Sequence, residues 1–351
     1  MAQASATAPA EPLELMGAAG SPYTRKMLAL LRYRRIPYAI HWASHRNPPA
    51  GYPEPSVKLL PTVYFRAPSG GHEAVVDSTP IIRRLEKERS GRSALPEDPV
   101  IAFLNYLVED YADEWLTKCM FHFRWAHAPD IANAGPMLIF WNDPTLPDSE
   151  AGAASDFISK RQIDRLYVVG SNPVTAKTIE ASYERIILAL DGVIQKNGYM
   201  FGARPSSADF ALYGQLTQLA VIEPTSAAIT ARLSRRIRAW LDRVEDLSGL
   251  APGPGDWLPR ETAADRAMPV LTEIGRVYVP FLTANAGAVM SGAERVDTVI
   301  DGRPWTQPSF PYQAKCLGWI REAYLGLSAQ DRSVVRQYLA PSGCEALLAG
   351  L

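Results

Sequence analysis

The sequence predicts a small α/β domain followed by an all-helical region and a mostly helical C-terminal extension. Three patterns in the 351-residue chain support this prediction. Residues 12–96 alternate between strand-like and helix-like segments, an order compatible with a small α/β sandwich. Residues 100–246 are dominated by segments with helical periodicity. The run Pro252-Gly253-Pro254-Gly255 then marks a boundary, and about 100 residues with further helical patterns follow it.

These patterns divide the chain into four parts. Residues 1–11 are expected to form a disordered leader, since they are rich in Ala, Ser and Pro and lack the basic and apolar regions of a signal peptide. The expected domains are residues 12–96 (α/β), 97–250 (all-α) and 251–351 (an extension packed on the α domain).

The α/β region is expected to run strand, helix, strand, irregular segment, strand, strand, helix. The strands are predicted at residues 13–18, 38–42, 62–65 and 73–76, and the helices at residues 23–35 and 79–88. Met27, Leu30 and Leu31 share one face of the first helix, because residues three and four apart lie on the same side. A proline-rich connection follows the second strand, and Ser69-Gly70-Gly71 forms a turn between the last two.

The remaining chain is expected to be helical with two interruptions. Helices are predicted at residues 100–127, 154–169, 174–196, 207–221, 226–246, 262–290, 313–327 and 331–340. The first interruption, residues 128–153, contains four prolines and is predicted to be a loop or a lid-like insertion. The second is a hairpin suggested by Asp301-Gly302.

Composition narrows the possible functions. Apolar residues make up 47% and charged residues 21% of the chain, as in ordinary soluble globular proteins. The formal net charge of −1 gives no long-range attraction to nucleic acid or to an anionic membrane. No window approaches the roughly 18 consecutive apolar residues of a membrane span. We therefore expect neither a nucleic acid nor a membrane as partner.

The cysteines and histidines do not suggest a metal or disulfide framework. Cys119, Cys316 and Cys344 are odd in number and far apart, which is typical of reduced thiols in a cytoplasmic protein. His122 and His127 have the wrong spacing for one helix face, so no metal site is expected.

Three short motifs suggest chemistry. In Ser21-Pro22-Tyr23-Thr24, serine is a good N-cap and proline suits the first helical position. The cap alone explains this motif, but a free hydroxyl at a helix N-terminus also favours an anion such as a thiolate.

The second motif, Leu59-Leu60-Pro61-Thr62, places a proline directly before a strand. An ordinary trans bond is one interpretation. A cis bond is the other, and it would leave the backbone N–H and C=O of Leu60 free to pair with an extended peptide.

The third motif, Asp77-Ser78-Thr79-Pro80, opens the last helix of the α/β region. Double capping explains it. A helix start also binds a carboxylate, and an acid beside it would hold an ammonium, so together they suit an amino-acid head group.

Taken in order, these motifs resemble the glutathione transferase superfamily. "SPYT" stands at the active-site position of that family, "LLPTV" is similar to its cis-proline segment, and "VDSTPI" is similar to its γ-glutamyl-binding segment. A fourth match is Ser206-Ser207-Ala208-Asp209, a Ser-x-x-Asp capping box that resembles the family's buried structural box. The resemblance covers roughly residues 12–247 and implies a thioredoxin-like N-terminal domain.

The resemblance assigns roles position by position. It implies that Ser21 is catalytic and donates a hydrogen bond to the glutathione sulfur, with Tyr23 beside it as the next candidate. Leu60 and Pro61 would hold the cysteinyl unit, and Asp77 and Ser78 the γ-glutamyl group. Ser206 and Asp209 would be structural. Because Ser21 and Thr24 replace the two cysteines of a redox pair, dithiol chemistry is not expected.

The implied function is transfer of glutathione, the co-substrate, to a small apolar electrophile by a cytoplasmic homodimer. The alternatives are a non-enzymatic interaction module of the same fold, or a glutathione-dependent isomerase, ether-cleaving enzyme or peroxidase. The extension lies outside the family core and could cover the substrate site, extend a dimer interface or bind another protein.

An aromatic run lies where the electrophile site is expected, at the first helices of the α region. Trp115, Phe121, His122 and Trp125 are candidates to line that site. An aromatic stripe at helical spacing can equally belong to the core. Asp113 and Glu114, which are polar groups among aromatics, need partners if they are buried.

Overall fold

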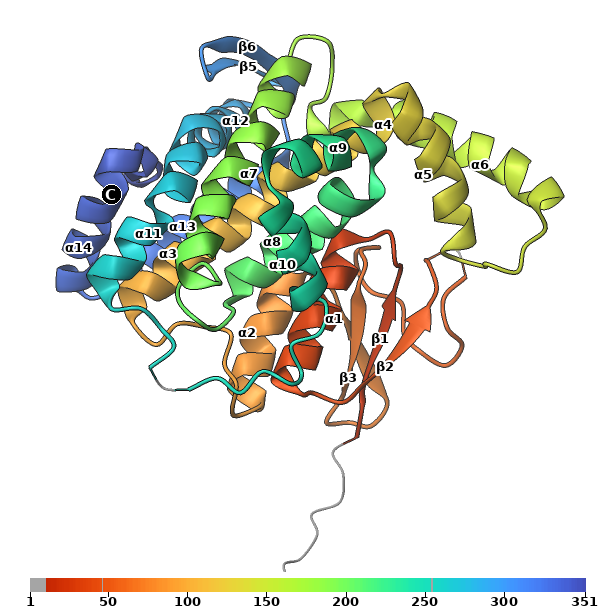
Figure 1. Ribbon diagram of the computed structural model, residues 1–351, viewed down its shortest axis with the longest axis horizontal. Helices are drawn as coiled ribbons and strands as arrows, with labels where there is room; N and C mark the ends of the chain where they lie inside the picture. The colour runs from red at the N-terminus through yellow and green to blue at the C-terminus, as the bar shows by residue number, and fades with distance from the viewer. Residues whose placement is uncertain (1–10, 46, 254) are drawn as a thin grey trace, which may run out of the picture.

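The N-terminal part of the chain is a four-stranded mixed sheet with two helices beside it (Figure 1). The computed structural model describes residues 11–45, 47–253 and 255–351, so most of the predicted leader lies outside the described residues. The sheet order is β2-β1-β3-β4, and its strands are β1 (Leu13–Gly17), β2 (Tyr38–Trp42), β3 (Thr62–Arg66) and β4 (His72–Val75). The helices are α1 (Pro22–Arg34) and α2 (Ser78–Glu88).

The connections explain the strand directions. β1 and β2 are parallel because α1 crosses between them, whereas β1–β3 and β3–β4 are antiparallel. Met27, Leu30 and Leu31 are fully buried, as the spacing predicted. α1 packs against α8 (Ser207–Thr217) of the helical region, so the two parts of the chain share a continuous hydrophobic core.

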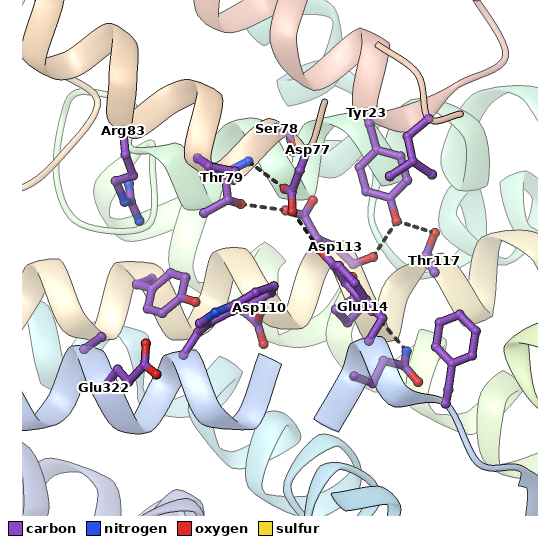
Figure 2. A pocket seen from close by; sticks show the side chains of 18 of the residues that line it. Tyr23, Asp77, Ser78, Thr79, Arg83, Asp110, Asp113, Glu114, Thr117 and Glu322 are labelled. Carbon is purple, nitrogen blue, oxygen red and sulfur yellow. Dashed lines mark hydrogen bonds between the residues drawn. The ribbon is translucent and has the colours of Figure 1, made fainter. Parts of the chain in front are cut away.

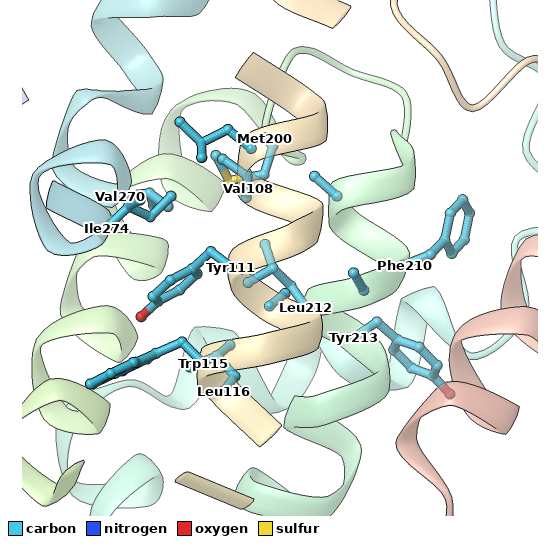
Figure 3. Packing of buried hydrophobic residues seen from close by; sticks show 14 of the residues in the cluster. Val108, Tyr111, Trp115, Leu116, Met200, Phe210, Leu212, Tyr213, Val270 and Ile274 are labelled. Atoms are coloured by element: carbon cyan, nitrogen blue, oxygen red, sulfur yellow. The ribbon is translucent and has the colours of Figure 1, made fainter. Parts of the chain in front are cut away.

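The helical region surrounds a central pair of helices. Its elements are α3 (Pro99–Tyr111), η1 (Ala112–Leu116), α4 (Thr117–Ala126), α5 (Ala128–Phe140), α6 (Asp148–Ile163), η2 (Leu166–Val169), α7 (Ala176–Asn197), α8, η3 (Gln218–Ile222), α9 (Pro224–Leu233) and α10 (Arg235–Val244). Every residue of α8 is buried, and α8 packs on α3 (Figure 3). The π-helical turn η1 joins α3 to α4 and changes the phase of the helix face.

Two predictions for this region were wrong in detail. Residues 128–153 are not mainly a loop, because α5 fills half of the segment and the start of α6 fills a further part of it. Pro129 occupies the first turn of α5, where no N–H is needed, and the helix continues through Pro136. The helix predicted at residues 226–246 is two helices, because Ser234 ends α9 and its hydroxyl caps α10 by accepting from Ile237 N at 3.1 Å.

The capping box at the start of α8 is present in the structure. The Asp209 carboxylate accepts from Ser206 N at 2.8 Å, from Ser206 Oγ at 2.7 Å and from Met200 N at 2.9 Å. Burial outweighs these hydrogen bonds and raises the pKa of Asp209 to about 6. The box therefore fixes the loop before α8 as well as the helix itself.

The C-terminal extension packs on the helical region. Its elements are α11 (Arg260–Glu273), η4 (Ile274–Tyr278), α12 (Val279–Ser291), β5 (Arg295–Ile300), β6 (Arg303–Pro308), α13 (Pro311–Leu325), α14 (Ala329–Leu339), η5 (Ala340–Ser342) and η6 (Cys344–Leu348). Helices α11, α13 and α14 contact α3 (Figure 1). The predicted hairpin is confirmed, with Asp301 and Gly302 both at positive φ (53° and 71°), as a tight two-residue turn requires.

The predicted fold class is confirmed: an α/β domain, an all-helical domain and a mostly helical extension. In the part of the chain that the structure describes, no helix is both long enough and apolar enough to cross a membrane. The three cysteines are buried free thiols.

Candidate functional site

A cavity of about 1090 Å³ lies where the α/β domain, the helical domain and the extension meet. The α/β domain contributes Tyr23, the segment before Pro61 and the start of α2. α3, η1 and α4 form the floor, and α13 of the extension forms the opposite wall (Figure 2). The lining is mainly apolar, with a small group of charged side chains among which Asp77, Asp113 and Glu114 are labelled in Figure 2.

The N-terminus of α2 opens into this cavity. Asp77 is the N-cap and has φ 76°, a conformation that is uncommon for a residue with a side chain. Its Oδ1 accepts from Thr79 N at 3.2 Å, and its Oδ2 accepts from the Tyr312 hydroxyl at 2.8 Å. The first turn of α2 therefore presents both an acid and a helix N-terminus to the cavity, and the extension contacts that acid directly.

Behind Ser78 lies a buried lysine. Lys26 Nζ of α1 donates to Ser78 Oγ at 3.0 Å, to Glu109 Oε1 at 2.9 Å and to Asp113 Oδ2 at 2.6 Å. Because the Ser78 oxygen accepts from the ammonium, its own hydrogen remains available to a ligand. Glu109 Oε2 accepts in turn from Ser207 Oγ at 2.6 Å, so this network joins α1, α2, α3 and α8.

The two carboxyls that contact Lys26 differ in their ionisation. Burial opposes the charge of Glu109, but Lys26 and Arg83 together outweigh it and lower the pKa of Glu109 to about 2. For Asp113, burial is the larger effect, and it raises the pKa to about 6 despite the same ammonium.

The proline segment borders the same cavity. The Leu60–Pro61 peptide bond is cis, and Leu59 and Leu60 line the cavity. Leu59 O accepts from Thr62 Oγ1 and is also 2.9 Å from His45 Nε2. Among the residues that the structure describes, none is hydrogen-bonded to the backbone of Leu60. Leu60 can therefore pair with a ligand backbone.

Ser21 acts as the N-cap of α1. Its Oγ accepts from Thr24 N at 3.2 Å, and the hydroxyl hydrogen is not used in that bond. Ser21 is half-buried and is not one of the residues that line the cavity, whereas its neighbour Tyr23 is. The end of α5 lies close by, since a side chain at Gly20 would collide with Trp141.

The chain matches two family models. The model described as "Glutathione S-transferase, N-terminal domain" matches residues 15–93, and the one described as "Glutathione S-transferase, C-terminal domain" matches residues 153–243. The chain belongs to the glutathione transferase superfamily. The sheet and helices of the N-terminal part are accordingly its thioredoxin-like domain. No curated protein matches the chain in sequence.

Three solved structures of the superfamily are similar to this chain at TM-scores near 0.3. A glutathione S-transferase from Methylobacterium radiotolerans in complex with glutathione sulfonate is 20% identical, with coverage of 71% of this chain and 100% of the other (TM-score 0.32). A glutathione transferase homologue from Lodderomyces elongisporus, with two glutathione molecules per subunit, is 16% identical, with coverage of 70% and 95% (TM-score 0.33). A family member from Pseudomonas fluorescens with bound S-(propanoic acid)-glutathione is 16% identical, with coverage of 67% and 99% (TM-score 0.32).

Tyr23 lines the cavity of this superfamily member, but its hydroxyl is already engaged. It donates to the Asp113 carbonyl oxygen at 2.7 Å and lies 3.0 Å from Thr117 Oγ1 (Figure 2). Burial and the nearby carboxylates raise the pKa of Tyr23 well above its usual value. Tyr23 therefore ties α1 to the helical domain and has no free proton for a sulfur atom.

The four aromatic-run candidates do not line the cavity, which corrects the sequence-based expectation. Trp115 is fully buried in the core and donates to Ser182 Oγ at 2.8 Å. Trp125 is buried, Phe121 packs against the core, and His122 contacts Ser171. Their neighbours Glu114, Thr117 and Lys118 face the cavity instead, because they continue at helical spacing the face that α3 turns to it.

Sequence reasoning missed most of the charged groups of the cavity. Burial raises the pKa of Glu114 to about 7 and lowers that of Lys118 to about 7. Glu114 Oε2 accepts from Gln313 Nε2 at 3.0 Å, so α13 contacts the cavity floor here too. Charged residues among aromatics were the sequence signal for Glu114, but no pattern connects it with Gln313.

Proposed function

We propose that this protein binds glutathione along Leu60, Asp77 and Ser78 and transfers its thiolate to an apolar electrophile in the rest of the cavity. The observation that carries the proposal is the convergence of two separate motifs on one cavity. The cis-proline segment and the N-terminus of α2 both open into it, and the remaining lining is mainly apolar. Membership of the superfamily supports the choice of glutathione.

The γ-glutamyl group suits the start of α2. A carboxylate there would accept from the free hydroxyl hydrogen of Ser78 and from backbone N–H groups, with the helix dipole favouring its charge. The Lys26 ammonium behind Ser78 adds a positive charge on the same side. The ligand ammonium would contact Asp77, which already holds the Tyr312 hydroxyl. Tyr312 thereby makes the extension part of the proposed site.

The cysteinyl unit would pair with the backbone of Leu60, whose N–H and C=O carry no other partner in the described part of the chain. Its sulfur would then be directed toward the start of α1. There the Ser21 hydroxyl can donate its hydrogen, because its oxygen already accepts from Thr24 N.

The chemistry requires a lowered thiol pKa. A free thiol has a pKa of about 8.5 and is only a few per cent ionised at neutral pH. Lowering the pKa by about two units requires roughly 2.7 kcal/mol of preferential thiolate stabilisation. One hydrogen bond from Ser21 together with a helix N-terminus is of that size.

The apolar electrophile would occupy the part of the cavity between α3 and the extension. Val168 and Val169 of η2 lie at one side, and Phe103, Phe310 and Trp319 contribute aromatic surface. Since Phe310 and Trp319 belong to the extension, the proposal assigns the extension a role as a wall of the electrophile site. We extend the proposal to a cytoplasmic homodimer, the form that the family resemblance implies.

A second candidate is glutathione binding without catalysis. Two observations on Ser21 favour this candidate. Its oxygen caps α1, and Ser21 is not among the residues that line the cavity. In that case the chain would be an interaction module that uses the same binding site.

Two assays test the proposal. Calorimetric titration of glutathione should show one site per chain, and a spectrophotometric assay with a generic aryl halide should show conjugation above the uncatalysed rate. Binding without conjugation would select the second candidate. Absence of glutathione binding would contradict both.

A further inference from the structure

Three potential metal ligands meet where α4, α5 and α7 pack together. His122 lies on α4, His127 is the residue between α4 and α5, and Glu180 lies on the first turns of α7. One nitrogen of each imidazole and one oxygen of the carboxylate all lie within 4.8 Å of one another. None of the three lines the cavity described above.

The end of α4 explains how residues five apart come together. On one helix this spacing puts two side chains on different faces, which is why the sequence predicted no metal site. His127 has extended backbone (φ −115°, ψ 136°) and so lies outside the helical spacing. The ring centroids of His127 and His122 are 5.3 Å apart, with an interplanar angle of 87°. Phe123 stacks on the His127 ring.

Two of the three distances between the potential ligand atoms match those around a coordinated ion. His122 Nε2 lies 3.4 Å and His127 Nε2 lies 3.5 Å from the same Glu180 oxygen, Oε1. Tetrahedral zinc has bonds of about 2.0–2.1 Å to nitrogen and about 2.0–2.2 Å to oxygen, so its ligand atoms are about 3.3 Å apart. The distances from Glu180 Oε1 to the two Nε2 atoms are therefore already close to that separation.

Among the three ligand atoms, His122 Nε2 and Glu180 Oε1 are hydrogen-bonded to each other at 3.4 Å, and a bound ion would replace that contact. Ser171 Oγ is 2.8 Å from His122 Nδ1, and this contact orients the ring with Nε2 toward Glu180. His127 Nε2 is a buried atom without a hydrogen-bond partner. Within the described residues, Glu180 forms ion pairs with these two histidines and with no lysine or arginine.

We propose that His122, His127 and Glu180 bind a divalent transition-metal ion of the zinc type. Two imidazoles and one carboxylate form a ligand set that suits zinc and related ions and disfavours Mg²⁺, which prefers oxygen ligands. The side chains of His127 and Glu180 are 29% and 39% exposed, so an ion can enter from solvent and keep a water molecule as a further ligand. The bound ion would join the α4–α5 junction to α7.

Calorimetry of the chelator-treated full chain with Zn²⁺ tests this site, with Mg²⁺ as the control ion. His127→Ala and Glu180→Gln change partly exposed ligands, so both variants should keep the fold, as circular dichroism can verify. Glu184→Gln is the matched control, because Glu184 lies one turn further along α7 and pairs with Arg232.

We expect one Zn²⁺ per chain, a dissociation constant at least tenfold higher in His127→Ala and in Glu180→Gln, and no change in Glu184→Gln. Zn²⁺ should also raise the melting temperature of the wild type more than that of either ligand variant. The absence of saturable Zn²⁺ binding would overturn the proposal. Unchanged Zn²⁺ affinity in both ligand variants would also overturn it, because the ion would then bind elsewhere.

Discussion

Replacing Lys26 by methionine should strongly destabilise the protein. The lysine side chain is 1% exposed, and its Nζ contacts Glu109 and Asp113, whose side chains are 0% and 11% exposed. At 2.6–2.9 Å, each attraction is about 6 kcal/mol at an effective dielectric constant of about 20, and the desolvation of the ammonium offsets much of it. Breaking a buried ion pair typically costs about 3–5 kcal/mol.

The structure places the expected loss near the lower end of that range, at about 3 kcal/mol. Glu109 keeps a partner in the variant, because Arg83 Nη2 lies 3.2 Å from its Oε2. Asp113 keeps only a long contact with Thr79 Oγ1 at 3.4 Å, and its Oδ1 is buried without a partner. Asp113 is therefore the group that the substitution leaves unpaired.

The loss should depend on pH. The pKa of Asp113 is already raised to about 6 by burial, and without the ammonium it should rise further. The folded variant then binds more protons than the unfolded chain, so its stability falls as pH rises through the raised pKa. The difference from wild type should be largest above that pKa and should shrink toward pH 5.

Urea unfolding followed by circular dichroism at pH 5 and pH 8 measures this effect. Lys58→Met is the matched control, because Lys58 is exposed and pairs with Glu54 at 3.6 Å, and its loss should cost less than about 0.5 kcal/mol. A loss below about 1 kcal/mol for Lys26→Met, or an equal loss at both pH values, would show that the ammonium does not offset the buried charge of Asp113.

Three further predictions follow from named contacts. Ser78→Ala should weaken glutathione binding by about 1–2 kcal/mol, measured by calorimetry, and unchanged affinity would remove Ser78 from the site. Asp209→Ala removes the acceptor of three buried hydrogen bonds and should lower stability by about 2–4 kcal/mol, with unchanged glutathione affinity per folded molecule; a fully stable variant would contradict its structural role. Tyr312→Phe should cost about 1 kcal/mol of unfolding free energy, whereas the exposed Tyr167→Phe should cost nothing measurable, and equal effects would show that the contact with Asp77 is not stabilising.

Local sequence signals predicted the parts of the site that depend on local structure. Ser21 and Asp77 cap their helices, and Ser206 with Asp209 forms a capping box, because capping involves residues within one turn. The strand and helix order of residues 12–96 was predicted for the same reason, since each element shows its own periodicity.

The remaining parts depend on long-range contacts. The packing of η2 and α13 against one face of α3 and α4 decides that Lys118 borders the cavity while Trp125 lies in the core, and this packing has no local sequence signal. Tyr312 lies 235 residues from Asp77, and no sequence period relates two such positions. For the same reason, the sequence could not predict that Glu180 lies beside His122 and His127.

The titration of the thiol of bound glutathione shows whether the Ser21 hydroxyl stabilises the thiolate. The thiolate absorbs in the ultraviolet, so difference spectra of the complex across a pH series give the pKa of the bound thiol in wild type and in Ser21→Ala. This substitution removes the hydroxyl but keeps the helix N-terminus and its dipole.

We expect a thiol pKa about two units below the free value of about 8.5 in wild type. In Ser21→Ala we expect the thiol pKa to rise by about one unit, which is 1.36 kcal/mol, and conjugation near neutral pH to be roughly tenfold slower. The same thiol pKa in both proteins would show that Ser21 does not stabilise the thiolate and serves only as the cap of α1.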